Sequence, residues 1–328
     1  MTSIALLDNS HAEEFRSVFR EVFGSDITPA LVDWKYGTAD RGLQFGAFSA
    51  EPRMVAHCGL TFRTALIENQ TRRIAQVGDL CSVRNKPGGL ARGSSVFGTL
   101  LRHTLDQIPS KDNPDAVFYG FPGDTAMKLI KRLGIGTSLN VIHELSFLPT
   151  PSASVEASSS SIFSADLRLV RVTDFGGGFA RLVERLWGRM ANDFGSGALG
   201  VRDAHYLNFR YLKHPDHAYE IYRVAGLFGR TIGLAVCRRT GTELELMDLV
   251  ASLSDMSRCI VTLQSNLNAM GIGTLKMWLL DRYAQHFSAL AASVVPLQFH
   301  LMVEYRNSGG IDRFKDRWWL TSGDADYR

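Results

Sequence analysis

The sequence predicts an α/β fold in which one unit, a mixed sheet with helices on its faces, occurs twice. A motif of an aromatic residue, a basic residue and a tyrosine occurs at residues 34–36 and again at 209–211. A leucine stands shortly before each copy, and two strand-like runs follow each copy. A second pair of segments, residues 77–83 and 246–252, continues the correspondence. The offsets between the copies are 175 and 169 residues, and such near-constant spacing is typical of a duplicated unit.

Hydrophobic periodicity and turn residues predict the elements of the first unit. Residues 11–23 place Phe15, Val18, Phe19 and Val22 at helical spacing, so we expect an amphipathic helix there. Gly134 follows another amphipathic run, at the position where helices favour a left-handed residue. The other expected elements are strands at 43–49, 54–68 and 72–83, a helix at 94–107, a strand at 115–121, a helix at 124–133, and a strand at 141–147 that closes the sheet.

A boundary divides the chain at residues 149–161, a stretch rich in Ser, Pro and Ala that has no apolar periodicity. We expect a first unit at 1–148, a linker at 149–161 and a second unit at 162–328. The helix that follows residues 246–252 has Ser254 or Asp255 as a plausible cap, but no glycine loop precedes it. The lack of a glycine loop distinguishes the second unit from the first.

The composition is that of a globular protein. The chain has 328 residues, a formal net charge of +3 and 45% hydrophobic residues, which gives no argument for nucleic acid as a partner. No signal peptide or membrane span is expected, and a cytoplasmic location follows as a prediction. The four cysteines lie far apart in the sequence, so free thiols are expected rather than a disulfide framework or a metal site.

The strongest functional signal lies at residues 75–101, where a strand leads through a glycine-rich turn into an amphipathic helix. The first turn of a helix has unpaired N–H groups, and glycines before it let the backbone close around an oxyanion. This order predicts a phosphate-binding loop, with Asp79 on the strand that precedes it. Basic residues that could add to an anion-binding patch are Arg102, Lys128, Lys131 and Arg132.

The order of these elements resembles the GNAT superfamily of acyl-CoA-dependent N-acyltransferases. That family's pyrophosphate signature, Q/R-x-x-G-x-G/A, is similar to residues 92–97, although Ser95 and Phe97 stand where small Gly or Ala is usual. The resemblance implies that acetyl-CoA or another acyl-CoA is the donor, bound along the strand backbone at Cys81 and Val83. The loop residues that it assigns to the donor are Arg92, Gly93, Ser94 and Ser95.

The resemblance also implies a catalytic carboxylate on the strand before the loop. Asp79 stands 13 residues before Arg92 and fits the position of a general base that takes a proton from the attacking amine. The alternative is a structural carboxylate that pairs with Arg63, Arg72 or Arg84. The echo of Asp79 in the second unit, Asp248, supports this alternative.

Three further side chains are candidates for the chemistry. Tyr119, on the strand after the cofactor helix, could protonate the departing thiolate, although a strand aromatic commonly fills a core. His57 could act as a base or contact the substrate, and His143 is a weaker candidate, since a lone strand histidine is commonly structural. Cys58 and Cys81 have no positive neighbour in sequence, so a thiolate nucleophile is not favoured.

The acceptor is expected to be a small primary amine held between the two units. The second unit is expected to hold no cofactor of its own and to form one wall of the acceptor cleft. The end of the chain resembles tandem GNAT-like proteins of sugar modification, which implies an amino sugar that Trp318 and Trp319 could stack on and Asp324 or Asp326 could bind. These residues would otherwise form a strand docked into the core. Two other functions stay open: a Fem-like transferase that uses aminoacyl-tRNA, and a degenerate binding protein.

Overall fold

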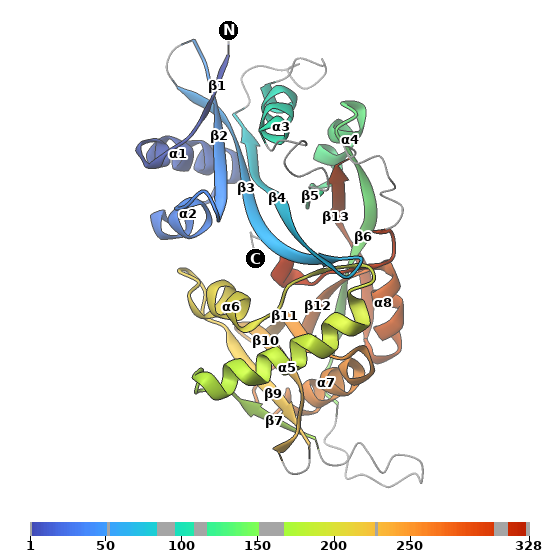
Figure 1. The fold of residues 1–328 in the computed structure, drawn as a ribbon. Helices are drawn as coiled ribbons and strands as arrows, with labels where there is room; N and C mark the ends of the chain where they lie inside the picture. The colour runs from blue at the N-terminus through green and yellow to red at the C-terminus, as the bar shows by residue number, and fades with distance from the viewer. Residues whose placement is uncertain are drawn as a thin grey trace.

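The computed structural model describes residues 2–50, 53–83, 96–107, 117–150, 167–226, 229–304 and 314–325. The first half begins with a short strand and two helices, and continues with three strands in sequence (Figure 1). A helix, a strand, a helix and a long strand complete it. Its elements are β1 Ser3–Leu6, α1 Ala12–Phe23, α2 Pro29–Tyr36, β2 Gly42–Phe48, β3 Met54–Ile67, β4 Gln70–Ser82, α3 Val96–Asp106, β5 Val117–Gly120, α4 Asp124–Arg132 and β6 Gly136–Phe147.

The second half repeats this order and adds a short strand, β8, and a C-terminal segment, residues 314–325. Its elements are β7 Arg168–Arg171, α5 Gly177–Phe194, β8 Ala198–Gly200, α6 Ala204–Leu207 with the π-helical turn η2 Asn208–Leu212, β9 Glu220–Ala225, β10 Thr231–Thr240, β11 Glu243–Ala251, α7 Leu253–Asn266, β12 Thr274–Leu280, α8 Asp281–Phe287, β13 Ser293–Glu304, β14 Trp318–Trp319 and the single turn η6 Ser322–Asp324. The expected helices and strands are present. The predicted order omitted β1 and α2 and their counterparts, β7 and α6.

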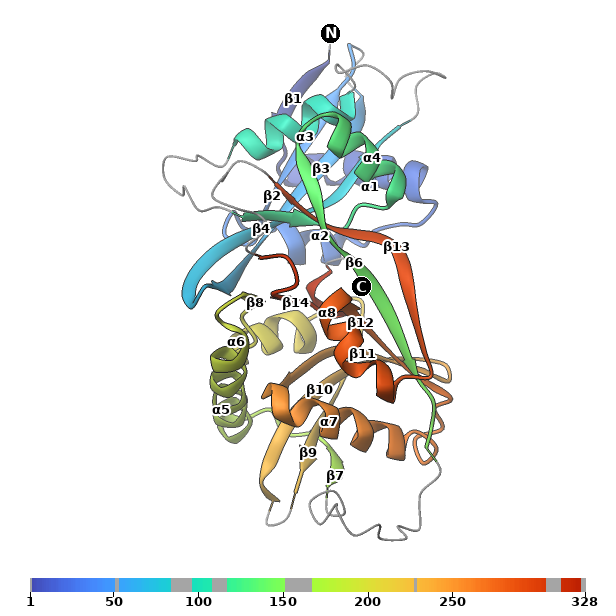
Figure 2. The ribbon, with the colours of Figure 1, turned by 90° about the vertical axis from the view of Figure 1, so that its right-hand side faces the viewer.

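One sheet runs through both halves, and its order among the described strands is β1-β2-β3-β4-β5-β13-β6-β12-β11-β10-β9-β7. The last strands of the two halves are exchanged: β6 pairs with β12, and β13 pairs with β5. The two exchanged strands also pair with each other, and they cross between the halves in Figure 2. The strand expected to close the first sheet therefore pairs instead with the second half.

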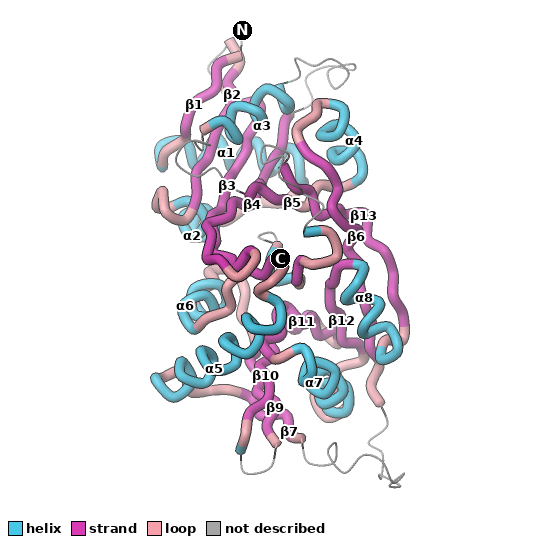
Figure 3. Tube along the Cα trace, turned by 45° about the vertical axis from the view of Figure 1, so that its right-hand side comes forward, coloured by secondary structure: helices cyan, strands magenta, loops and turns pink. Residues whose placement is uncertain are grey.

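Helices cover both faces of the sheet (Figure 3). In the first half, buried residues of α3 and α4 pack with Leu60, Ala75 and Val77 in one cluster. Residues of α1 and α2 belong to a separate cluster with Met54 and Cys81. Because side chains alternate along a strand, Thr61 and Gln76 point away from α3 and α4.

Candidate functional site

A gap between two neighbouring strands marks the centre of the first half. Strands β4 and β5 run parallel, and their pairing ends at Val77 and Gly120 while β4 continues to Ser82. Just beyond this point the pairing of β3 with β4 shifts, so that Cys58 opposes both Asp79 and Leu80. Asp79 has a φ of 47°, in the left-handed region. This bulge turns the strand where the two neighbours separate.

The predicted donor residues are only partly within the described chain. Cys81 lies at the end of β4, is buried and pairs with His57 of β3. The backbone N–H of Val83 donates to the carbonyl of Val55 at 2.8 Å, so β3 engages this amide. The loop residues Arg92, Gly93, Ser94 and Ser95 lie outside the described residues, and their assignment stays a prediction.

Asp79 forms a buried ion pair. Thr28 and Pro29 start α2, because the Thr28 hydroxyl caps the N–H of Leu31, and the end of this helix brings Lys35 and Tyr36 to β4. Lys35 Nζ lies 3.0 and 2.9 Å from the two Asp79 oxygens, and the Tyr36 hydroxyl donates at 2.7 Å. The two ionic side chains are 2% and 6% exposed.

These contacts set the charge of Asp79. Burial alone would raise the pKa of this carboxyl, but the Lys35 ammonium and the Tyr36 hydroxyl outweigh burial and lower the pKa. Of the arginines considered as partners, Arg63 pairs with Asp324 and Arg72 donates to Gln70, while Arg84 lies outside the described residues. The role of Asp79 as a general base stays a prediction.

The second half repeats the tyrosine–carboxylate contact. Tyr211 donates to Asp248 at 2.8 Å, as Tyr36 does to Asp79. The C-terminal segment lies against this pair: Thr321 Oγ1 donates to Asp248 at 3.3 Å. A Cβ added at Gly323 would lie 2.0 Å from the Tyr211 hydroxyl and 2.7 Å from the Met247 carbonyl oxygen. The chain itself therefore fills the space beside Asp248.

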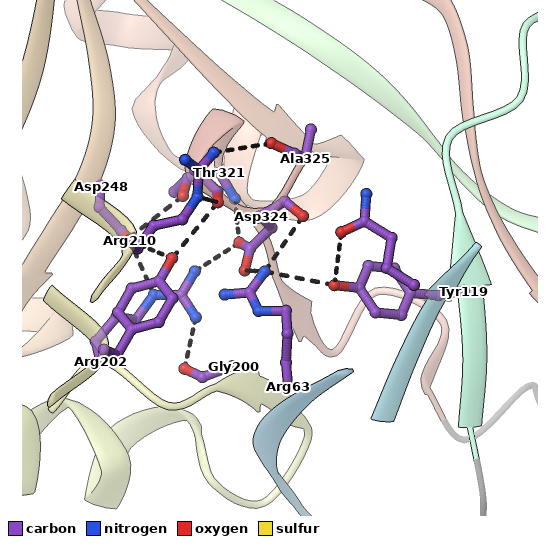
Figure 4. A network of polar contacts seen from close by, with 12 residues as sticks. Arg63, Tyr119, Gly200, Arg202, Arg210, Asp248, Thr321, Asp324 and Ala325 are labelled. Atoms are coloured by element: carbon purple, nitrogen blue, oxygen red, sulfur yellow. Dashed lines mark hydrogen bonds and ion pairs between the residues drawn. The ribbon is translucent and has the colours of Figure 1, made fainter. Parts of the chain in front are cut away.

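Buried arginines hold the C-terminal segment between the halves (Figure 4). Arg202 is fully buried and donates to Asp248 at 2.9 Å and to Asp324 at 2.5 Å, and Arg63 lies 2.8 Å from Asp324. Arg210 donates to the carbonyls of Gly323 and Ala325. Burial raises the pKa of Asp324, but the guanidinium groups of Arg202 and Arg63 outweigh it and lower the pKa. Asp324 is thus an ionised link between the halves.

His57 is enclosed in the first half. Its ring stacks on Phe15 with 3.8 Å between centroids, and the ring nitrogens contact the Asp79 carbonyl at 2.9 Å and the Gln44 amide at 3.2 Å. Burial lowers the pKa of His57 to about 4. The ring is therefore neutral at pH 7, with Nδ1 as the donor to the carbonyl.

Tyr119 is buried on β5, and its hydroxyl is part of a polar network that joins the two halves. Its hydroxyl donates to Gln76 at 3.2 Å and accepts from Arg63 at 3.4 Å. Since Arg63 also binds Asp324, Tyr119 is joined to the C-terminal segment (Figure 4). Its role as a proton donor stays a prediction.

A cavity of about 760 Å³ opens between the halves. Its walls come from α2, β3 and β4 of the first half and from α5, α6 and the C-terminal segment of the second. The lining includes Lys35, the partner of Asp79, together with Arg63 and Gln76, the partners of Tyr119. Its aromatic members are Trp34, Phe62, Trp187, Tyr206 and Phe209.

The sequence did not single out Lys35, Arg63 or Gln76. Lys35 carried a signal, because it is the basic residue of the repeated aromatic–basic–tyrosine motif. Arg63 appeared only as a possible partner of Asp79, and Gln76 had no distinguishing pattern. Their importance comes from contacts between distant segments.

Several other candidates have ordinary structural places. Trp318 and Trp319 are buried in the core, which confirms the alternative of a docked strand, and the amino-sugar acceptor loses the support of a stacking surface. His143 Nδ1 lies 3.5 Å from Asp281 Oδ1. His143 is on β6, which is separated from β5 and the gap by strand β13. Asp326 lies outside the described residues. The basic residues proposed for an anion-binding patch, Arg102 on α3 and Lys128, Lys131 and Arg132 on α4, are exposed.

The four cysteines are buried and free, as expected. Burial raises the pKa of Cys58 and of Cys81 to about 12, which keeps both thiols protonated at neutral pH. Within the described ranges, no group of three or more His, Cys, Asp or Glu is arranged to hold a metal ion. None of the helices described combines the length and apolar character needed to span a bilayer.

Comparison with solved structures identifies the fold. A probable N-acyltransferase from Enterococcus faecalis V583 superimposes with a TM-score of 0.66 at 10% identity, over 92% of this chain and 72% of that one. A GCN5-related N-acetyltransferase from Kribbella flavida gives 0.64 at 16% identity, over 92% and 70%. Saccharomyces cerevisiae N-myristoyltransferase, solved with myristoyl-CoA, gives 0.56 at 10% identity, over 92% and 79%.

No protein-family model matches the sequence, and no curated protein matches it. The structural similarities establish the fold, which is a mixed α/β architecture of two GNAT units in tandem, since N-myristoyltransferase has this double fold. The fold class predicted from the sequence is confirmed, and the predicted resemblance holds for the fold.

Proposed function

We propose that this chain transfers an acyl group from an acyl-CoA to a primary amine. The observation that carries the proposal is the gap between β4 and β5, which begins after Val77 and lies between α3 on one face and the cavity on the other. A thioester that enters from the α3 side and an amine that enters from the cavity would meet there. Holding two reactants in this way supplies much of the rate enhancement in such transfers.

The reaction is direct attack of the neutral amine on the thioester carbonyl, without an acyl-enzyme. The C–N bond forms through a tetrahedral intermediate, the nitrogen loses one proton, the C–S bond breaks, and the CoA thiolate takes up one proton and leaves as the thiol. Backbone N–H groups of the bulged part of β4 are the proposed stabilisers of the oxyanion. The buried and protonated thiols of Cys58 and Cys81 support a mechanism without a cysteine nucleophile.

One donor site in each chain is proposed, in the first half. In the second half, the C-terminal segment fills the space beside Asp248, whereas the first half has the cavity beside Lys35 and Gln76. The glycine-rich sequence before α3 has no counterpart before α7. Both differences favour a second half that serves as a wall for the acceptor.

The test is release of CoA thiol from acetyl-CoA and longer acyl-CoAs in the presence of a panel of primary amines. We expect release that depends on the amine, an acylated amine in the mass spectrum, and no mass gain on the protein incubated with acyl-CoA alone. Arg92→Glu should weaken donor binding, with Arg53→Glu, an exposed substitution on another loop, as the matched control. A protein that binds no acyl-CoA would overturn the proposal.

A further inference from the structure

Basic side chains predominate in the cavity wall. Five lysine and arginine side chains line it against three carboxylates, which are Asp40, Asp203 and Asp324. Two of the deeper positive charges have carboxylate partners: Lys35 pairs with Asp79, and Arg63 pairs with Asp324. A third, Arg210, is buried and donates to the carbonyls of Gly323 and Ala325. The remaining positive charge lies in the exposed part of the wall.

Arg41 and Arg73 carry that charge. Both are exposed, and in the described part of the chain neither forms an ion pair. The Arg73 guanidinium lies 4.0 Å from the Phe62 ring centroid and donates to the Asp40 carbonyl at 3.1 Å. The Arg41 guanidinium lies 5.3 Å from the ring centroid of Phe209. Aromatic rings and a carbonyl thus orient two guanidinium groups without neutralising them.

The position of Arg73 on β4 gives a length scale. Gln76 and the gap at Gly78 follow Arg73 on the same strand, by three and five residues. At about 3.3 Å per residue, the strand places the Arg73 backbone roughly 10 Å from Gln76 and roughly 16 Å from the gap. A group bound at Arg73 is therefore well separated from the reacting amine.

We infer that the acceptor is an elongated amine whose far end carries an oxyanion, a carboxylate or a phosphate, which Arg41 and Arg73 bind. This inference rests on the proposed function for the identity of the amine end. Guanidinium groups match both oxyanions through paired hydrogen bonds. The aromatic wall formed by Trp34, Phe62 and Phe209 suits an apolar or planar middle part.

Equilibrium binding tests the inference without requiring turnover. The probes are tetra-alanine with a free carboxylate and its C-terminal amide, 8-aminooctyl phosphate and 8-aminooctanol, and glycine as a short anionic amine. Four extended residues span roughly 13 to 14 Å, so tetra-alanine can reach from the gap to within a side-chain length of the Arg73 backbone. Calorimetry should show the long anionic probe of one pair, or of both, binding at least tenfold more tightly than its neutral partner and than glycine. The pair that shows the preference identifies carboxylate or phosphate.

Substitutions in the cavity wall test whether Arg41 and Arg73 cause the preference for the anionic probes. Arg41→Gln and Arg73→Gln should each reduce the anionic preference at least threefold, and Asp40→Asn should increase it, because it removes a negative charge from the same wall. Arg53→Gln, which only breaks a surface pair with Glu21, is the matched control and should leave binding unchanged. Equal binding of charged and neutral partners in both pairs, or a preference insensitive to Arg41 and Arg73, overturns the inference. Failure of acyl-CoA to bind would instead overturn the proposed function, since the probe titrations do not use the donor.

Discussion

The rings of Trp34 and Phe209 stack in nearly parallel planes, with their centroids 4.9 Å apart and an interplanar angle of 8°. The indole N–H of Trp34 also lies 3.3 Å from the Phe209 carbonyl oxygen. These two residues occupy the same place in the repeated motif, 175 residues apart. The halves therefore meet through equivalent residues, as two copies related by an approximate twofold axis do.

This stack should couple the two halves energetically. Trp34→Ala and Phe209→Ala should each destabilise the protein, and the double variant should lose less than the sum, with a coupling of about 0.5 to 1.5 kcal/mol. Urea unfolding of the three variants measures it. Phe175 and Phe179, which pack edge to face with Phe175 partly exposed, give a control pair with a smaller coupling. Strict additivity at Trp34 and Phe209 would contradict the account.

The Lys35–Asp79 pair should act as a unit. Asp79→Asn or Lys35→Met leaves one buried charge without its partner, so each should cost about 3 to 5 kcal/mol of unfolding free energy. The double variant should lose much less than the sum. Urea unfolding checks this expectation.

The same variants test Asp79 as a base. At a temperature where each is folded, a pairing role predicts similar losses of kcat for Asp79→Asn and Lys35→Met, with the pH profile from 6 to 9 unchanged in shape. A loss confined to Asp79→Asn, together with a changed pH profile, would instead establish the base. The lowered pKa of Asp79 favours the first outcome, because a weakly basic carboxylate gains little by accepting the proton.

Stability should fall in acid because of Asp79 and Asp324. Both carboxyls have a pKa below the ordinary value of 3.8 in the folded state, so their contribution is present above that pH and is lost as the pH falls through the folded values. Each can add up to about 1.4 kcal/mol per pH unit to the slope in that range. Urea midpoints between pH 2.5 and 6 measure it. Asp324→Asn should flatten the slope, and an unchanged slope in that variant would contradict the assignment.

The thiols should be inert in the native protein. The side chains of all four cysteines are buried, and burial raises the pKa of Cys58, Cys81 and Cys259 to about 12. A disulfide reagent at pH 8 should therefore report no rapidly reacting thiol before denaturant is added, and four afterwards. One fast thiol in the native state would show that a cysteine is accessible.

Local patterns predicted much of this fold. The periodicity of residues 11–23 corresponds to α1, Gly134 ends α4 with a φ of 65°, and the repeated motif correctly indicated a duplicated unit. These features depend on neighbours within a few residues, which is where sequence patterns carry information. The exchange of β6 and β13 could not be predicted in this way, because either partner strand satisfies the same alternating pattern.

The site was less predictable for the same physical reason. Asp79 and Lys35 are 44 residues apart, and only the packing of α2 on β4 makes them a pair. Arg63 and Asp324 are separated by 261 residues. The cavity wall combines segments from both halves, so its charge could not be read from any one motif.

The number of donor molecules bound by each chain tests the central claim most directly. The fold occurs twice, and the donor site is proposed to occur once, because the C-terminal segment fills the second half beside Asp248 and no glycine loop precedes α7. Calorimetric titration of the full chain with acetyl-CoA should give one site per chain, which Arg92→Glu weakens. Two sites per chain, or none for any acyl-CoA, would contradict the account.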